Sequence, residues 1–141
     1  MQGCELCESE GGALLWRNAL LRVVAVDEPD YPGFCRVILQ RHVREMSDLD
    51  LPDRDNVMHA VFAVEAALRD SMQPHKINLA SLGNLTPHLH WHVIPRFEDD
   101  AHFPAPVWAA RKRESRSRAV DLEDLRAGIA RHAAKLGLQH G

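Results

Sequence analysis

The sequence lacks long apolar runs and has few cysteines. No stretch approaches the ~20 apolar residues that cross a bilayer. The N-terminus, Met1 to Glu5, has neither the basic nor the apolar part of a secretion signal. There are only three cysteines, and such an odd and sparse set argues against a disulfide framework. These absences predict a cytoplasmic protein that does not contact a membrane.

The chain also lacks a strong excess of one charge. A formal net charge of −3 over 141 residues argues against a nucleic-acid surface held by general electrostatics. One basic run, Arg111 to Arg113 followed by Arg116 and Arg118, needs its own explanation. Glu114 and the nearby serines dilute its charge, which favours a solvated loop over a grip on phosphate.

The length and the 45% hydrophobic content suit a chain that buries its own core. We find no internal repeat and no low-complexity segment. We place a main domain over residues 1–110 and a C-terminal helical extension over residues 111–141.

Turn residues divide the chain into short strands and two helical patterns. A helix is predicted from about Pro52 to Met72, ended by Pro74, and a second from Leu122, capped by Asp121. The expected strands are 13–16, 20–26, 34–39, 75–82 and 88–96. The pattern predicts an α+β fold: a five-stranded sheet with one long helix and one C-terminal helix.

The most informative stretch is His88-Leu89-His90-Trp91-His92-Val93-Ile94. Alternation of polar and apolar residues is typical of a half-buried strand. We therefore expect the three histidines to project from one face, while Leu89, Trp91 and Val93 enter the core.

This stretch resembles the signature of the histidine triad (HIT) family, in which three histidines alternate with apolar residues. The resemblance extends over roughly the first hundred residues, and it points to the bacterial branch that is similar to diadenosine tetraphosphate hydrolases and carries a zinc knuckle. It implies an antiparallel five-stranded sheet with helices packed on it, a homodimer and a nucleotide substrate.

The resemblance also assigns roles to the histidines. The middle one, His90, corresponds to the nucleophile that attacks the α-phosphorus of a nucleotide and forms a nucleotidyl-histidine. A neutral imidazole is available for this attack near pH ~7. His92 corresponds to a donor to a phosphate oxygen, and His88 completes the catalytic trio.

Four further residues resemble nucleotide contacts of the family. Asp27 matches the acidic ribose contact, and Asn78, Asn84 and Thr86 fall near polar phosphate contacts, although asparagine in loops also forms turns. One departure stands out: Phe34 occupies the position at which many relatives carry a fourth histidine.

Cys4 and Cys7, with two residues between them, favour metal or redox use. In similar proteins such a knuckle shares a tetrahedral Zn²⁺ with two histidines, and the matching residues are His42 and His88. A Cys₂His₂ site of this kind is closed and structural. Cys35 has no place in it and is predicted to be a core residue.

Three functions stay open at this stage. The first is a nucleotidyl hydrolase or transferase that acts through His90. The second is a nucleotide-binding regulatory module without turnover, for which Phe34 is the argument. The third is a metalloenzyme in which all three strand histidines hold one catalytic metal. The segment Phe103 to Trp108 is either a local core plug, a lid over the histidines or a subunit contact.

Overall fold

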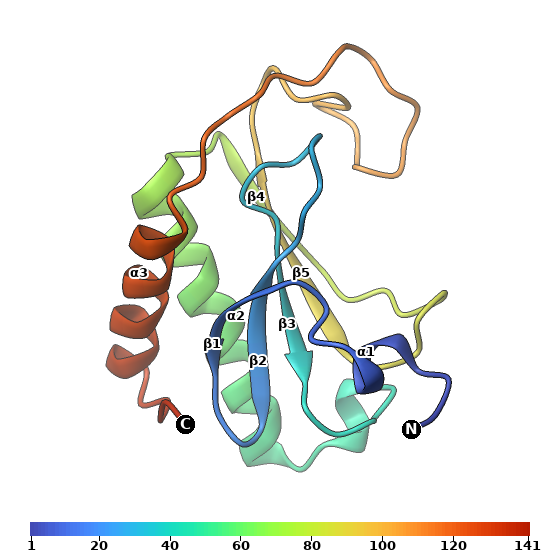
Figure 1. The fold of residues 1–141 in the computed structure, drawn as a ribbon, viewed down its shortest axis with the longest axis vertical. Coiled ribbons are helices and arrows are strands. Elements are labelled where there is room, and N and C mark those ends of the chain that lie inside the picture. The colour runs from blue at the N-terminus through green and yellow to red at the C-terminus, as the bar shows by residue number, and fades with distance from the viewer.

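The computed structural model describes all 141 residues as an α+β fold, as predicted (Figure 1). Its elements, in chain order, are α1 (Glu5–Glu8), β1 (Ala13–Arg17), β2 (Leu21–Ala25), β3 (Cys35–Leu39), the 3₁₀ turn η1 (Met46–Asp48), α2 (Leu51–Met72), β4 (Lys76–Ala80), β5 (His90–Arg96) and α3 (Leu122–Lys135). No helix combines the length and the apolar character that crossing a membrane requires.

The five strands form one sheet in the order β1-β2-β3-β5-β4, and every neighbouring pair is antiparallel. Helices α2 and α3 lie together on one face of this sheet (Figure 1). The short α1 packs on the other face through Leu6, which contacts Val24 and Ile38. We call this second face the open face, because most of its area carries no helix.

Alternation along the strands separates the two faces. Val37 of β3 and Val93 of β5 are fully buried beneath the helices, together with Leu125 and Ile129 of α3. Leu89 and Trp91 also pack in or against this core, as predicted, and Cys35 is completely buried there. The division of the chain at residue 110 stays a prediction.

Both long helices begin at aspartate caps, of which Asp121 was predicted. The Asp50 carboxylate accepts a hydrogen bond from the Asp53 backbone at 2.9 Å, and Asp121 does the same for Asp124 at 3.1 Å. Helix α2 ends at Gln73, which takes a left-handed conformation immediately before Pro74.

Several strand boundaries differ from the predicted ones. The fifth strand begins at His90, two residues later than expected, because the Leu89 backbone N–H donates to the Val43 carbonyl at 2.7 Å, outside the sheet. The fourth strand is Lys76–Ala80 rather than 75–82. Helix α1 lies in the cysteine segment, where no helix was predicted.

A long connection between β5 and α3 is held by a buried ion pair. Arg96 donates to Asp100 at 2.7 and 3.0 Å, and both side chains are at most 5% exposed. Asp100 also accepts from the backbone N–H groups of Phe97, His102 and Phe103. A single carboxylate thus shapes the turn that leaves the sheet.

The basic run in this connection binds the protein itself. Arg111 pairs with Asp30 at 2.6 Å, while Arg116 and Arg118 share Asp99. Arg113 donates to the backbone carbonyls of Asp100 and Phe103. This arrangement supports the loop interpretation over a phosphate grip.

Candidate functional site

The three histidines are directed to the same side of the sheet, as expected, because the cysteines that His88 contacts belong to the segment packed on the open face. His90 and His92 lie on the open face with their rings 5.0 Å apart. His88 precedes the strand, is fully buried, and instead lies 5.1 Å from the His42 ring. Its ring contacts the N-terminal cysteines, whereas the rings of His90 and His92 contact each other.

The tautomer of His90 follows from its hydrogen bond. The Nδ1 atom lies 2.6 Å from the carbonyl oxygen of His88. Because a carbonyl can only accept, Nδ1 carries the proton and Nε2 keeps a lone pair. His90 is thereby oriented by its own backbone, with the reactive nitrogen on the opposite side of the ring.

His92 occupies a less polar environment. Its Nδ1 is buried and has no hydrogen-bond partner, and its ring makes an edge contact with Phe34, whose centroid is 5.3 Å away. Phenylalanine offers neither a donor nor an acceptor, so Phe34 leaves the His92 Nδ1 unpaired.

Both imidazoles are neutral near pH 7. Burial lowers the pKa of His92 to about 4, and the positive charge of Arg36 acts in the same direction. Burial also lowers the pKa of His90, although the hydrogen bond to the His88 carbonyl opposes the shift. Neutral rings provide the lone pair that nucleophilic attack requires.

A second cluster of side chains adjoins His90 through His88. It consists of Cys4, Cys7, His42 and His88. Their ligand atoms all lie within 4.8 Å of one another. The Cys4 and Cys7 sulfurs are each 3.4 Å from the His88 Nδ1, and the Cys7 sulfur is also 3.4 Å from the His42 Nδ1. Bonds of about 2.3 Å to sulfur and about 2.0 Å to nitrogen put tetrahedral ligands roughly 3.5 Å apart. The cluster therefore fits Zn²⁺.

Two surrounding contacts prepare this cluster for a metal. The His88 Nε2 donates to the Leu39 carbonyl at 2.7 Å, which leaves its Nδ1 free to face the cysteines. The buried Arg22 of β2 donates to the carbonyls of Leu6, Ser9 and Glu10, and so holds the segment that carries Cys7. Sequence reasoning missed Arg22, because an arginine in a short strand gives no sign of backbone partners far along the chain.

The four predicted nucleotide contacts lie in different local settings, and their role stays a prediction. Asp27 is exposed and lines a cavity of about 560 Å³ with Ser115 and Arg118. The Asn78 side chain accepts from Arg96 at 2.8 Å. Asn84 is exposed, and Thr86 contributes its carbonyl to the His88 backbone N–H. No hydrogen bond joins any of the four to His90 or His92.

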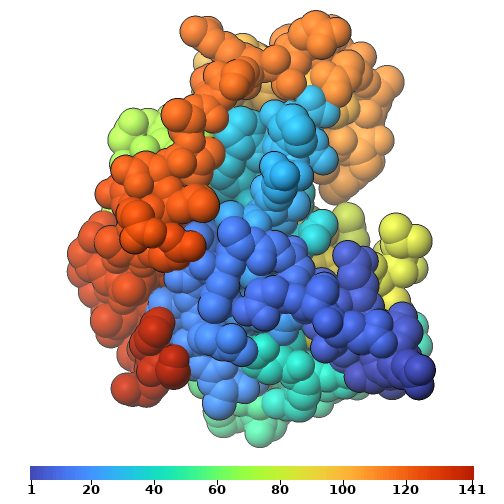
Figure 2. Space-filling view, in the orientation of Figure 1, coloured from blue at the N-terminus to red at the C-terminus, as the bar shows by residue number.

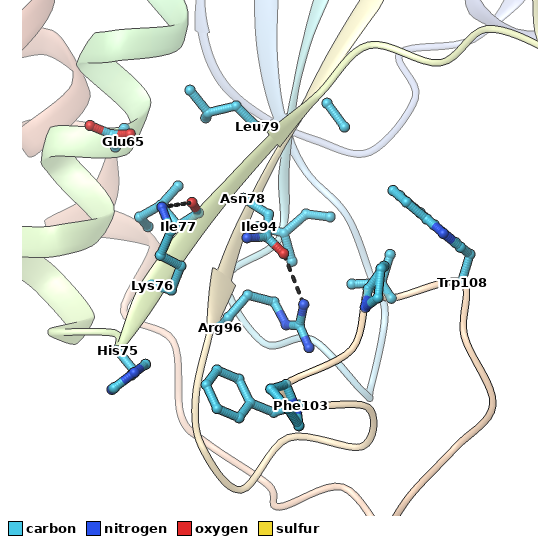
Figure 3. Close-up of a pocket in the computed structure, with 14 residues that line it drawn as sticks. Glu65, His75, Lys76, Ile77, Asn78, Leu79, Ile94, Arg96, Phe103 and Trp108 are labelled. Atoms are coloured by element: carbon cyan, nitrogen blue, oxygen red, sulfur yellow. Dashed lines mark hydrogen bonds between the residues drawn. The ribbon is translucent and has the colours of Figure 1, made fainter.

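A larger cavity of about 720 Å³ runs along the edge strand β4. Ala80, the register partner of His92, lines it, as do Asn78 and Ile94. Phe103 and Trp108 face these strands from the long connection (Figure 3). Trp108 is 66% exposed, so it is not a core plug, and the lid and subunit-contact interpretations remain.

The space-filling view shows where the segments around the sheet gather (Figure 2). The N-terminal residues, in blue, cover the lower part of the sheet, and the long connection, in orange, overhangs its upper end. The loop before β5, in yellow, stands out at the same edge as the connection, with a hollow between the two.

Comparison with solved structures identifies related folds. A histidine triad protein of Bradyrhizobium japonicum is 28% identical, with a TM-score of 0.70 over 88% of this chain and 92% of that one. A Zn-bound histidine triad family protein of Mycobacterium smegmatis has a TM-score of 0.62 over 96% of both chains, at 17% identity. The latter likeness shows the fold alone.

Comparison of sequences gives the family. A curated relative, the AP-4-A phosphorylase of Mycobacterium tuberculosis, is 30% identical over 100 residues, which are 67% of this chain and 51% of the relative. The chain thus spans about half the length of that relative. The HIT domain matches residues 12–99, more than half of the chain and the whole of the sheet. With this match and the 30% identical relative, the chain belongs to the histidine triad (HIT) family.

Proposed function

We propose that this protein cleaves a nucleoside polyphosphate or phosphoramidate at the α-phosphorus, through a nucleotidyl intermediate on His90. The observation that carries the proposal is the 2.6 Å hydrogen bond from the His90 Nδ1 to the His88 carbonyl. It leaves the Nε2 lone pair available on the open face.

The proposed first step forms a bond between the His90 Nε2 and the α-phosphorus. The bond from phosphorus to the leaving group breaks, and its electron pair departs with that group. As Nε2 becomes bonded, positive charge develops on the ring, and the His88 carbonyl stabilises the Nδ1 proton. His92, two residues along the same face, donates to a phosphate oxygen.

The proposed second step releases the nucleotide. Water, or inorganic phosphate, attacks the phosphorus while the phosphorus–nitrogen bond breaks. The electron pair returns to the His90 Nε2, and the proton of the attacking group passes to solvent. The name of the curated relative makes phosphate a reasonable acceptor to test.

A Zn²⁺ ion held by Cys4, Cys7, His42 and His88 has a structural role in this proposal. All four ligands come from the protein, so the site leaves no open position for substrate. When bound, the ion would crosslink the N-terminal segment to the residue that supplies the carbonyl contact of His90. Because only His88 of the trio joins this cluster, the geometry does not support a metal held by all three histidines.

A homodimer also belongs to the proposal, as the family resemblance implies. Strand β4 ends the sheet and has an unpaired edge, which supports an interface between copies there. Light scattering in solution tests it.

The central test is a pair of variants incubated with diadenosine tetraphosphate and with an adenosine phosphoramidate. We expect His90→Ala to lose turnover by at least about 1,000-fold and to form no protein-bound AMP in mass spectra of acid-trapped samples. His59→Ala, on α2, is the matched control and should retain turnover. A His90→Ala variant as fast as the parent would overturn the proposal.

The same assay separates hydrolase from phosphorylase. With phosphate added, a phosphorylase releases ADP from diadenosine tetraphosphate, whereas a hydrolase releases AMP. Zinc content should stay at the parent level in His90→Ala and fall in His42→Ala.

One observation favours a second candidate, a nucleotide-binding module without turnover. The His92 Nδ1 has no partner beside Phe34, so the ring lacks the contact that would fix its donor position. Nucleotide binding with neither product nor a trapped adduct would select this candidate.

A further inference from the structure

Arg36 is the one partly buried arginine of this protein whose side chain forms no hydrogen bond or ion pair. Its Nε is buried without a hydrogen bond, and no carboxylate lies within ion-pairing distance of its guanidinium. Arg44 and Arg69 also lack side-chain partners, but both are exposed to solvent. A guanidinium that is partly removed from water and left unpaired is costly, so such groups usually bind something.

The position of Arg36 relates it to the catalytic pair. It lies on β3 directly opposite His92 of β5, so both side chains project from the open face. Its guanidinium carbon is 5.5 Å from the centre of the Phe34 ring, and Phe34 also contacts His92. Arg36, Phe34 and His92 therefore form one contiguous group beside His90.

Charge on this face points to an anionic ligand. His92 is neutral near pH 7, which leaves the Arg36 guanidinium as the permanent cation in the group. Glu5 is the acidic residue whose charge acts on Arg36, and it is exposed and forms no ion pair with it. The planar guanidinium suits two oxygens of one phosphate.

We propose that Arg36 binds the phosphate that flanks the attacked one, and that this makes nucleoside polyphosphates, rather than phosphoramidates, the preferred substrate class. This inference rests on the proposed function. His90 and His92 follow each other along β5, and Arg36 stands across from His92, so a second phosphate placed past His90 reaches the guanidinium.

The chemical consequence concerns the leaving group. When the bond from the α-phosphorus to the bridging oxygen breaks, the electron pair stays on that oxygen and adds negative charge to the departing phosphate. Arg36 stabilises this charge without transferring a proton. A phosphoramidate has an amine at this position and gains nothing from Arg36.

Binding tests the inference without requiring turnover. In calorimetric titrations of the His90→Ala protein, ADP should bind about 10- to 100-fold more tightly than AMP, as expected for charge-assisted hydrogen bonds to one phosphate. Adding Arg36→Met should remove that preference, and Arg36→Lys should restore part of it. An ADP preference that persists in Arg36→Met would overturn the inference.

Kinetics supply the second readout. Arg36→Met should lower kcat/KM for diadenosine tetraphosphate by about 100-fold and for adenosine phosphoramidate by less than about threefold. Equal losses on both substrates would indicate a structural role and reject the inference. Arg69→Met, on the helix-covered side, is the matched control and should change neither.

The two proposals fail differently. If the parent protein turns over neither substrate while ADP still binds in an Arg36-dependent manner, the proposed function fails and the phosphate site stands. If the parent protein turns over substrate and Arg36→Met has the parent's kcat/KM for both substrates, only the inference fails. Thermal melts of each variant establish that it is folded.

Discussion

His90 and His92 of the open face differ in the hydrogen bonding of their Nδ1 atoms. His90 has a backbone acceptor for its Nδ1, whereas the Nδ1 of His92 has none. The two imidazoles are therefore unequal although they share a strand face and a residue type. The His90 ring is fixed by its backbone hydrogen bond, whereas burial, with Phe34 among its neighbours, lowers the pKa of His92 and keeps that ring neutral.

The pKa of His92 gives a pH prediction at this scale. Its pKa is about 4 in the folded protein, against the ordinary histidine value of 6.5 that applies to the unfolded chain. Between these values the unfolded chain binds more protons, so stability falls as pH drops from 6.5 toward 4. We expect His92 to account for a loss of about 2 kcal/mol between pH 7 and pH 5.

Urea unfolding of the parent and of His92→Gln at the two pH values checks this expectation. The variant should lose about 2 kcal/mol less than the parent over the same interval. His132→Gln is a suitable control, because His132 lies on α3, away from the open face, and hydrogen-bonds Asp70. Equal losses in the parent and His92→Gln would contradict the prediction.

At the scale of elements, α1 is held on the sheet by few contacts. It has four residues, too few to be stable alone, and its anchors are Leu6, the metal cluster and Arg22. The donors of Arg22 reach three carbonyls along the segment that carries Cys7. The element thus depends on a side chain of β2 for its position.

We therefore expect Arg22→Met to weaken zinc binding by about 10- to 100-fold, although every metal ligand is retained. Competition with a chromophoric chelator measures this affinity. Arg17→Met is the matched control, since Arg17 only forms an exposed pair with Glu10 at 3.6 Å, and it should bind zinc as the parent does. Unchanged affinity in Arg22→Met would show that the ligands alone hold the segment.

At the scale of the whole molecule, the buried pair of Arg96 and Asp100 joins the sheet to the connection that leads to α3. Removing one member leaves the other charge buried, which typically costs about 3–5 kcal/mol, whereas an exposed pair contributes about 1 kcal/mol or less. Asp100→Ala should therefore destabilise the protein by roughly 3–5 kcal/mol. Asp99→Ala, one residue earlier, should cost about 1 kcal/mol or less.

Denaturant unfolding at pH 7 measures both variants. Losses of unfolding free energy of similar size in Asp99→Ala and Asp100→Ala would show that burial of the Arg96–Asp100 pair does not matter. Proteolysis within residues 97–121 offers an independent view, because Asp100→Ala should expose this connection and Asp99→Ala should not.

Much of the architecture could be predicted from local patterns. The apolar spacing of α2 and α3, the Asp121 cap of α3 and the alternation about His90 depend on neighbours in sequence, and the structure confirms these elements. The cysteine pair with His42 and His88 was also predicted, through the family resemblance, and the four side chains do converge.

The sequence by itself determined the strand that carries His90, because that strand depends on the short-range alternation of polar and apolar residues. The four residues able to hold a metal were predicted through the family resemblance. Only the tertiary structure decided that His88 contacts the two N-terminal cysteines, that Arg36 lies opposite His92, and that the Asn78 side chain pairs with Arg96. Those outcomes depend on strand register and on hydrogen bonds between residues distant in the chain, such as His88 to Leu39, and no local pattern encodes them.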